Sequence, residues 1–326
     1  MRIRRLMAGT AAVMTALAGA LGAGAVWAQE KLGQPTDKSL GLQPGAAPLK
    51  HDAIWFHDVI LLPIITVIVV FVLALLIWIV LRYNKRANPK PASFSHNTAI
   101  EILWTVIPVL ILVFIAFFSF SLLRKYNDMP TPDVVVKATG YQWYWAYDYP
   151  ELGVEGVESR LLPEARELKT AHAAKVPFLL GVDNELIVPV NKVVQVQVTG
   201  YDVIHSFALP AFGLKTDAIP GRLNSTWFKA EKPGIYYGQC SELCGVDHAY
   251  MPIAIRVVSE KEFDAYIIKA GGKTKAMIAA EEAAAAAAAQ QAAANAAASA
   301  DASATASAAA PAEADAAASA AAPAVQ

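Results

Sequence analysis

Two long apolar segments constrain this chain more than any other feature of its sequence. Residues 59–81 and 102–123 contain no Asp, Glu, Lys or Arg. Each is long enough to cross the ~30 Å hydrocarbon layer of a bilayer as a helix that rises about 1.5 Å per residue. Charged residues make up 17% of the chain, below the ~25% typical of soluble domains. We therefore expect a membrane protein with transmembrane helices over residues 59–81 and 102–123.

The loop between these segments predicts their direction across the membrane. Residues 82–101 contain one acid, Glu101, and four bases, Arg82, Lys85, Arg86 and Lys90. An excess of Lys and Arg marks a cytoplasmic loop, so we expect a helical hairpin with both ends outside the cytoplasm. Hydropathy alone is equally satisfied by a plain anchor. Glu101 abuts the second segment, where a carboxylate is costly unless it is hydrated or faces protein.

Both ends of the chain have the composition of segments without a core. Residues 1–28 combine three early arginines, an uncharged stretch and a cleavage-like end at Ala28, the pattern of a secretory signal peptide; a retained transmembrane helix is the alternative. Residues 29–58 are then a periplasmic segment. From Ala276 on, 32 of 51 residues are alanine, which favours helix but offers nothing large to bury. We expect a disordered, low-complexity tail over residues 271–326, with helix at most in its early part.

The region over residues 131–270 has the pattern of an all-β domain. In residues 193–198, Val194, Val196 and Val198 alternate with glutamines, as in a half-buried strand. Similar apolar runs, separated by turn residues, occur at residues 134–139, 141–149, 178–182, 186–190, 204–209, 226–230, 235–239 and 253–258. Many short strands at this spacing predict a sandwich or small barrel. Ser259 and Glu262 form a capping box that opens a closing helix to about Lys269.

The strongest chemical signal is a run of soft metal ligands near the end of this domain. Cys240, Cys244, His248 and Met251 fall within twelve residues, and His205 lies on an upstream strand. Sulfur and imidazole select copper or zinc over hard cations. A Cys240–Cys244 disulfide leaves the other three residues unexplained, and a zinc site has no use for a thioether. A mononuclear blue-copper site needs only one cysteine, and this run contains two. A two-copper centre with two bridging thiolates uses every residue.

At these residues the chain resembles subunit II of the haem-copper cytochrome c oxidases, with its CuA centre. The resemblance covers about residues 53–269 and rests on four motifs: residues 141–147 (YQWYWAY), residues 205–207 (HSF), residues 213–222 (GLKTDAIPGR) and residues 240–251. It implies a two-helix transmembrane hairpin followed by an all-β, cupredoxin-like Greek-key sandwich or barrel. It also implies a bacterial inner-membrane protein whose copper domain lies in the periplasm.

Carried over position by position, the resemblance implies a binuclear copper centre. Its ligands would be the side chains of His205, Cys240, Cys244, His248 and Met251 and the backbone carbonyl of Glu242. The carboxylate of Glu242 would also bind a magnesium ion shared with subunit I. The chain would accept electrons one at a time from cytochrome c and pass them to the haem of subunit I, which reduces oxygen to water coupled to proton pumping. No Cys-x-x-Cys-His is present, so the donor haem lies in a separate protein.

The resemblance also implies roles for residues outside the ligand set. Trp143 would be the point where electrons enter. It lies in residues 141–149, where alternation along a strand would place five aromatics on one face: Tyr141, Trp143, Trp145, Tyr147 and Tyr149. A set of acids would steer a basic cytochrome c: Asp148, Glu151, Glu155, Glu158 and Asp202. Taken alone, such acids are a solvated face. Glu101 would lie at the entrance of a proton pathway, and Lys215, Asp217 and Arg222 would contact subunit I.

Other function classes fit the sequence less completely. The net charge of −1 and pI near 6.6 provide no basic surface for nucleic acid. A quinol-oxidase subunit II has a related fold, but that branch lacks the copper ligands. The CuA domain of nitrous oxide reductase belongs to a soluble enzyme with a large propeller domain, for which this chain has no room. A disulfide-closed periplasmic module is the plain structural alternative.

Overall fold

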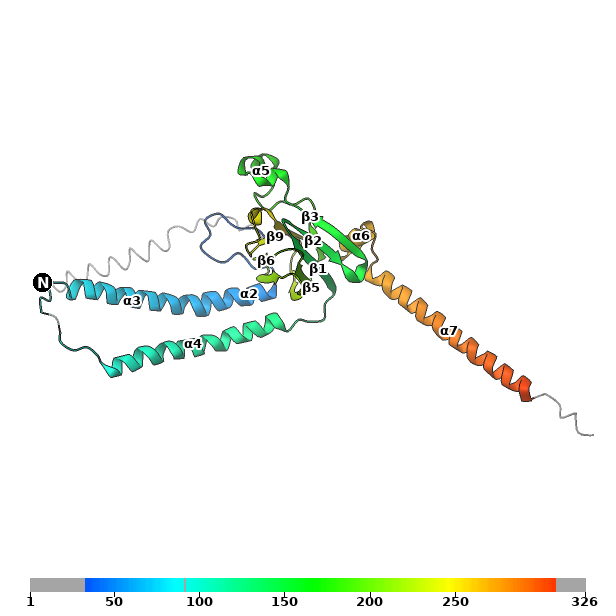
Figure 1. Ribbon diagram of the computed structural model, residues 1–326, viewed down its shortest axis with the longest axis horizontal. Helices are drawn as coiled ribbons and strands as arrows, with labels where there is room; N and C mark the ends of the chain where they lie inside the picture. The colour runs from blue at the N-terminus through cyan, green and yellow to red at the C-terminus, as the bar shows by residue number, and fades with distance from the viewer. Residues whose placement is uncertain (1–32, 91, 309–326) are drawn as a thin grey trace, which may run out of the picture. The chain divides into compact units, whose positions relative to one another are not determined.

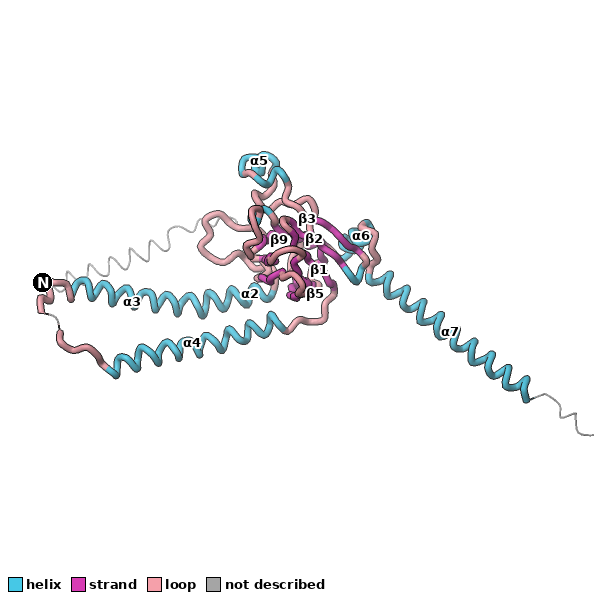
Figure 2. The backbone as a smooth tube through the Cα atoms, in the orientation of Figure 1, coloured by secondary structure: helices cyan, strands magenta, loops and turns pink. Residues whose placement is uncertain are grey.

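The computed structural model describes residues 33–90 and 92–308, so the expected signal peptide over residues 1–28 lies outside it. The described chain divides after Gly272 into two units, each described by itself. Figure 1 shows the first unit as a pair of long helices joined to a β domain, and Figure 2 shows the same elements by type. The described part of the second unit contains one helix.

The two apolar segments form helices, as predicted. The first is a continuous run of α2 (Pro48–Trp55), the π-helix η1 (Phe56–Leu61) and α3 (Leu62–Arg82), and the second is α4 (Thr98–Asn127). Both are long and apolar enough to cross a membrane, and their apolar windows are not buried within the protein. A groove of about 510 Å³ between α3 and α4 is lined by apolar side chains alone, among them Ile64, Val67, Leu110 and Phe114. Apolar side chains that the protein leaves uncovered are unfavourable in water but favourable against the hydrocarbon of a bilayer.

The β domain consists of ten strands in two five-stranded sheets. The sheet orders are β3-β2-β1-β5-β8 and β4-β10-β9-β6-β7. The strands are β1 (Val134–Tyr141), β2 (Tyr144–Tyr149), β3 (Val154–Ser159), β4 (Leu186–Pro189), β5 (Val193–Gly200), β6 (His205–Leu209), β7 (Leu214–Ala218), β8 (Asn224–Lys229), β9 (Gly234–Cys240) and β10 (Pro252–Val258). The pairs β1–β5 and β4–β10 are parallel, and the other pairs are antiparallel.

The core between the sheets follows the alternation read from the sequence. Val194, Val196 and Val198 of β5 are fully buried, while the glutamines between them are half-buried. Trp145, Tyr147 and Tyr149 of β2 are also fully buried. Burial of apolar area stabilises a fold by roughly 25 cal/mol per Å². These three large aromatic side chains therefore contribute most of the stabilisation that burial of their strand provides. The β-sandwich expected for residues 131–270 is therefore confirmed.

The aromatic segment over residues 141–149 is a hairpin and not the single strand that alternation predicts. β1 ends at Tyr141 and β2 begins at Tyr144, directly opposite it, so Gln142 and Trp143 form a two-residue turn. The rings of Tyr141 and Tyr144 stack at 4.8 Å. Trp143 therefore does not share a face with Trp145. A hairpin turn reverses the chain and ends the period-two alternation.

One further expectation, for residues 178–182, is corrected. Residues 178–182 form turns with a single bridge at Val182, because Leu179 has a φ of 59°, which a strand does not accept. In the second unit, the early part of the alanine-rich tail forms the helix α7 (Lys275–Ala308), as the helix propensity of alanine favours. The closing helix is confirmed as α6 (Glu260–Lys269), with the predicted capping box of Ser259 and Glu262.

Candidate metal centre

Two antiparallel strands bring the distant histidine to the cysteine run. His205 begins β6 and Cys240 ends β9, and Phe207 lies opposite Cys240 in the register. Because the strands are antiparallel, the start of one and the end of the other meet at one end of the sheet. The loop over residues 241–251 carries the remaining candidates and returns to the sheet at Pro252.

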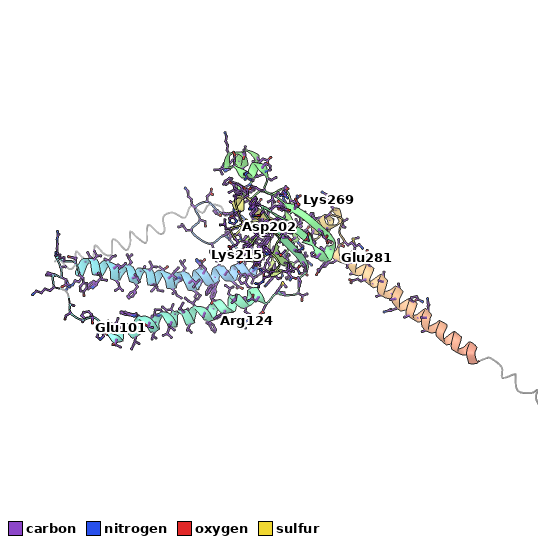
Figure 3. The ribbon with its side chains drawn as sticks, in the orientation of Figure 1. Glu101, Arg124, Asp202, Lys215, Lys269 and Glu281 are labelled. Carbon is purple, nitrogen blue, oxygen red and sulfur yellow. The ribbon has the colours of Figure 1, made fainter. Side chains whose placement is uncertain are left out.

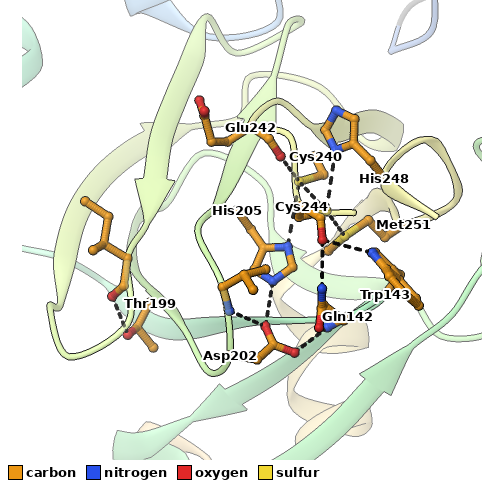
Figure 4. A network of polar contacts seen from close by, with 12 residues as sticks. Gln142, Trp143, Thr199, Asp202, His205, Cys240, Glu242, Cys244, His248 and Met251 are labelled. Carbon is orange, nitrogen blue, oxygen red and sulfur yellow. Dashed lines mark hydrogen bonds and ion pairs between the residues drawn. The ribbon is translucent and has the colours of Figure 1, made fainter. Parts of the chain in front are cut away.

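The predicted ligands converge on one cluster, shown in Figure 4. The Sγ atoms of Cys240 and Cys244 are 3.8 Å apart, and both cysteines are free. Each imidazole lies beside a different sulfur: Nδ1 of His205 is 3.9 Å from Cys240, and Nδ1 of His248 is 3.5 Å from Cys244. Sδ of Met251 lies 3.5 Å from Cys244 Sγ, and the Glu242 carbonyl oxygen lies 3.3 Å from Cys240 Sγ.

The cluster is mostly closed to solvent. His205 is fully buried, Met251, Cys240 and Cys244 are 1%, 6% and 4% exposed, and His248 is half-buried. One ligand atom each from His205, Cys240 and Cys244 lies within 4.8 Å of the others. Two soft sulfurs and two imidazoles at this separation match the preferences of copper or zinc. The thioether beside Cys244 favours copper.

The two thiols differ in acidity. Burial opposes ionisation of Cys240, but hydrogen bonds involving His205 and the Glu242 backbone lower its pKa to about 7. Burial, followed by the charge of the neighbouring Cys240 thiolate, raises the pKa of Cys244 to about 12. The pair therefore loses one proton near neutral pH and holds the second, as expected for two like charges at close range. A bound cation would displace the second proton.

Asp202, predicted as a docking acid, touches the candidate ligand His205. Its Oδ1 lies 2.9 Å from Nε2 of His205, and its Oδ2 accepts a hydrogen bond from the backbone N–H of Gln142 at 2.8 Å. Burial alone would raise the pKa of this carboxyl, but the hydrogen bonds to it, first that of His205, lower it. The same contact, with that to Cys240, raises the pKa of His205 against the effect of burial.

Trp143 lies directly on the candidate metal loop. Its Nε1 donates to the carbonyl oxygen of Cys244 at 3.2 Å, and the Gln142 side chain donates to the same oxygen at 2.9 Å (Figure 4). The absence of a side chain at Gly245 permits this contact, because a Cβ there would lie 2.9 Å from the Trp143 ring. The φ of Gly245 is 127°, which also favours glycine. The hairpin turn thus places an indole against the residue that carries a candidate ligand.

Sequence reasoning assigned no role to two residues that support the cluster. Trp145 is fully buried, donates from Nε1 to the Met251 carbonyl at 3.3 Å and meets the His205 ring edge-on at 6.0 Å. Gly140 admits the His205 ring, since a Cβ there would lie 2.9 Å from it. The aromatic alternation of residues 145–149 signals burial of Trp145 but not what it contacts.

The structure divides the predicted acidic patch. Asp148 pairs with Lys137 at 3.4 Å and accepts a hydrogen bond from the Gly156 backbone N–H, and Glu158 pairs with Arg160 at 2.8 Å. Glu151 and Glu155 are exposed, and among the described residues neither has an ion-pair partner within 4.0 Å. Asp202 is bound to His205 as above. The net negative field of this patch therefore rests mainly on Glu151 and Glu155.

Glu101 lies in the first turn of α4, far along the chain from the cluster, as Figure 3 shows. Its Oε1 accepts a hydrogen bond from the Asn97 backbone N–H at 3.2 Å, while Asn97 Oδ1 accepts one from Ile100 N–H at 3.3 Å. The two side chains cap the helix start reciprocally. Glu101 also lines a small surface hollow with Thr98, Ile102, Thr105 and Val106.

The residues predicted to contact subunit I lie at the surface beside the cluster. Lys215 and Asp217 of β7 are within 3.8 Å of each other, and Asp217 also accepts a hydrogen bond at 2.8 Å from Ser206, the neighbour of His205. Arg222 is exposed in the turn before β8. The Glu242 side chain is exposed as well, which leaves its carboxylate accessible to an ion from outside the chain.

Comparison with known proteins gives consistent similarities. The profile of the periplasmic domain of cytochrome c oxidase subunit II matches residues 134–258, and that of its transmembrane domain matches residues 35–122. Cytochrome c oxidase subunit 2 of Cereibacter sphaeroides is 46% identical over 276 residues, covering 80% of this chain and 91% of that protein. The probable subunit 2 of Rickettsia bellii is 46% identical over 251 residues, covering 76% and 91%.

Solved structures give similarities as well. The crystal structure of the periplasmic domain of subunit II of cytochrome oxidase from Bradyrhizobium japonicum is 59% identical and covers 44% of this chain and 96% of that one, with a TM-score of 0.39.

Proposed function

The chain belongs to the cytochrome c oxidase subunit II family and is a component of a haem-copper oxidase, and we propose that it carries single electrons from cytochrome c to the haem of subunit I through a binuclear CuA centre. The observation that carries the proposal is the convergence of two thiols, two imidazoles and a thioether at one end of the sandwich. In the complex, oxygen reduction and the proton pumping coupled to it take place in subunit I.

The donor set fits two copper ions. His205 would hold one and His248 the other, with Cys240 and Cys244 between them, because each imidazole stands beside a different sulfur. Met251 would complete one site and the Glu242 carbonyl the other. A bound copper pair supplies reversible one-electron oxidation and reduction. The buried surroundings hold the ligands in place between the two redox states.

Trp143 is proposed as the residue at which electrons enter. Its indole donates a hydrogen bond to the backbone of Cys244, so an electron delivered at the ring is one hydrogen bond from a candidate ligand residue. Trp143 is half-buried on the hairpin turn, which leaves part of its surface for contact with a partner. The exposed acids Glu151 and Glu155, at the other end of β2, would draw a basic cytochrome c to the β domain by long-range attraction. Asp148, Glu158 and Asp202 belong to the same docking proposal.

Glu242 is proposed to have two roles. Its backbone carbonyl would face one copper, and its exposed carboxylate would bind magnesium together with subunit I. A hard cation such as magnesium takes oxygen ligands and keeps several waters, so a single carboxylate from this chain is a suitable contribution. Lys215, Asp217 and Arg222 are proposed as contacts to subunit I on the same surface.

The membrane arrangement is proposed from the hairpin and its charges. Residues 59–81 and 102–123 would span the inner membrane, residues 82–101 would lie in the cytoplasm, and residues 131–270 would form the periplasmic copper domain. Residues 1–28 would be removed as a signal peptide, leaving residues 29–58 outside and residues 271–326 as a tail. Glu101, at the cytoplasmic end of α4, would collect protons for subunit I.

Copper analysis of the complex tests the proposal directly. The oxidase is purified in detergent with this chain at natural stoichiometry, and copper per chain is measured after the copper of subunit I is subtracted. We expect two coppers and an electron paramagnetic resonance signal shared by both. Cys240→Ser and Cys244→Ser should each lose that signal, whereas Ser241→Ala should keep it. A single copper with a signal localised on one ion would refute the binuclear assignment.

A further inference from the structure

The connection between β3 and β4 is a folded segment that closes on itself. Within residues 160–185, Leu162 N–H donates to the Gly181 carbonyl at 2.9 Å, and Leu161 bridges to Val182. The segment contains the single-turn helix η3 (Pro163–Arg166) and α5 (Leu168–Ala174), and Ala165 of η3 is fully buried. The backbone at Arg166, the last residue of η3, is therefore held in place by these hydrogen bonds and by the burial of Ala165.

Arg166 joins this segment to the candidate metal loop by two contacts. Its Nη2 donates to Oδ1 of Asp247 at 2.8 Å, and its guanidinium carbon lies 4.1 Å from the centre of the Tyr250 ring. Asp247 and Tyr250 stand on either side of His248 in the single-turn helix η4 and its N-cap. A planar guanidinium can serve both partners at once, through its edge and its face.

Residues 245–250, between the buried Cys244 and Met251, have few other anchors. Leu243 and Val246 are 79% and 85% exposed, and His248 itself is half-buried. The Cys244 carbonyl is bound by Gln142 and Trp143 and the Met251 carbonyl by Trp145. Between these two points the backbone bonds are local: His248 N–H to the Gly245 carbonyl at 3.3 Å, and Tyr250 N–H to the Asp247 carbonyl at 2.8 Å. Segments with little buried surface and only local hydrogen bonds open at low free-energy cost. His205 needs no such anchor, because it lies in a strand and is fully buried.

We propose that Arg166 is a positioning residue that holds the His248 side of the metal loop in its ligating conformation. The inference rests on the proposed copper centre and concerns a residue outside its ligand set. Arg166 contacts Asp247 and Tyr250, which lie on either side of His248. Loss of Arg166 therefore frees the imidazole to leave the cluster. The cluster then loses copper through its His248 side, while the His205 side stays formed.

Copper release from the intact oxidase tests this inference. The rate at which an excess of a copper chelator removes the thiolate absorption is measured for the parent, Arg166→Gln and Arg166→Lys. We expect release from Arg166→Gln to be about five- to tenfold faster, because an exposed ion pair and a cation–ring contact are each modest. Arg166→Lys should be intermediate, since a lysine keeps the charge but lacks the planar face.

Arg160→Gln is the matched control, because Arg160 makes the same two kinds of contact away from the loop. It pairs with Glu158 at 2.8 Å and lies 3.6 Å above the Tyr144 ring, and it is about as exposed as Arg166. Release from Arg160→Gln should match the parent. Equal rates for Arg166→Gln, Arg160→Gln and the parent would overturn the inference.

Two further measurements distinguish failure of the proposed role of Arg166 from failure of the proposed copper centre. Amide exchange of residues 245–251 in the metal-free full chain should rise in Arg166→Gln and not in Arg160→Gln, and unchanged exchange would contradict the proposed role of Arg166 whether or not copper binds. A parent complex without copper in this chain would instead refute the proposed function. The double variant Arg166→Gln, Asp247→Asn should release copper little faster than either single variant. Simple additivity of the two effects would show that the two residues act independently.

Discussion

Nε2 of His205 lies 2.9 Å from Oδ1 of Asp202. An ionised carboxylate only accepts hydrogen bonds, so this contact places the imidazole proton on Nε2 and leaves Nδ1 free on the side of Cys240. A partner of this kind sets which ring nitrogen faces a metal. An acid that the sequence suggested only for docking is thus also part of the support of the candidate centre.

Replacing Asp202 should therefore affect copper as well as docking. Asp202→Ala removes the acceptor for His205 and for the Gln142 backbone, and we expect copper affinity to fall about ten- to a hundredfold, as for other outer partners of metal-bound histidine. Glu151→Gln removes an exposed acid without such contacts and should leave affinity unchanged. Chelator competition measures both. Parent-like affinity in Asp202→Ala would return Asp202 to a docking role alone.

Met251 should tune the centre without being required for it. A thioether is a weak ligand, so Met251→Leu should keep both coppers while it shifts the reduction potential and slows onward electron transfer. The volume of the buried side chain is nearly conserved, which limits the cost in folding stability to less than about 1.5 kcal/mol. Potentiometry and flash-induced electron transfer check the prediction. An unchanged potential and rate would remove Met251 from the ligand set.

The acidity of the cluster predicts that copper uptake strengthens as pH rises. Copper needs both thiolates and a neutral imidazole; the pKa of Cys240 is lowered to about 7, that of Cys244 is raised to about 12, and that of His205 is raised. Below pH 6 the protons of both thiols must leave, whereas above pH 8 Cys240 has already lost its proton and that of Cys244 remains. Calorimetry of the metal-free chain in buffers of different ionisation enthalpy should show fewer protons released at pH 8 than at pH 6. A pH-independent release would contradict the separation of the two thiols.

The divided acidic patch predicts unequal effects on cytochrome c association. Neutralising Glu151 and Glu155 together should lower the association rate at low ionic strength more than neutralising Asp148 and Glu158, whose charges are offset by Lys137 and Arg160. The difference should shrink near 0.15 M salt, where the Debye length is about 8 Å. Stopped-flow mixing measures it. Identical rates for the Glu151 and Glu155 double variant and the parent at low salt would leave these acids a solvated face.

Glu101→Gln separates a proton role from helix capping. Glutamine keeps an oxygen that can accept the Asn97 N–H but cannot ionise, so assembly and copper content should be normal while steady-state oxygen consumption falls at the steps that draw protons through this entrance. Asn97→Ala is the complementary control, since it removes the cap and keeps the acid. Turnover like that of the parent across pH 6–9 would make Glu101 a capping acid only.

The sequence by itself determined the features that repeat along the chain. Two apolar segments of helical length, the alternation of Val194, Val196 and Val198, and the capping box of Ser259 and Glu262 depend on neighbours within a few residues, and the structure confirms each of them. The chemical kinds of the candidate ligands were also evident, because soft sulfur and imidazole within twelve residues have few other uses. The metal centre was thus predictable in its composition.

Only the tertiary structure decided which residues serve that centre. The aromatic pattern predicted one strand over residues 141–149, but the chain reverses at Gln142 and Trp143. The position of this turn is set by the pairing of β2 with β1. The contacts of Asp202 with Gln142 and of Arg166 with Asp247 join residues 60 and 81 positions apart. Local periodicity records which face of a strand is buried, but contacts between distant loops depend on how two sheets and their connections pack, and no short window of sequence contains that information.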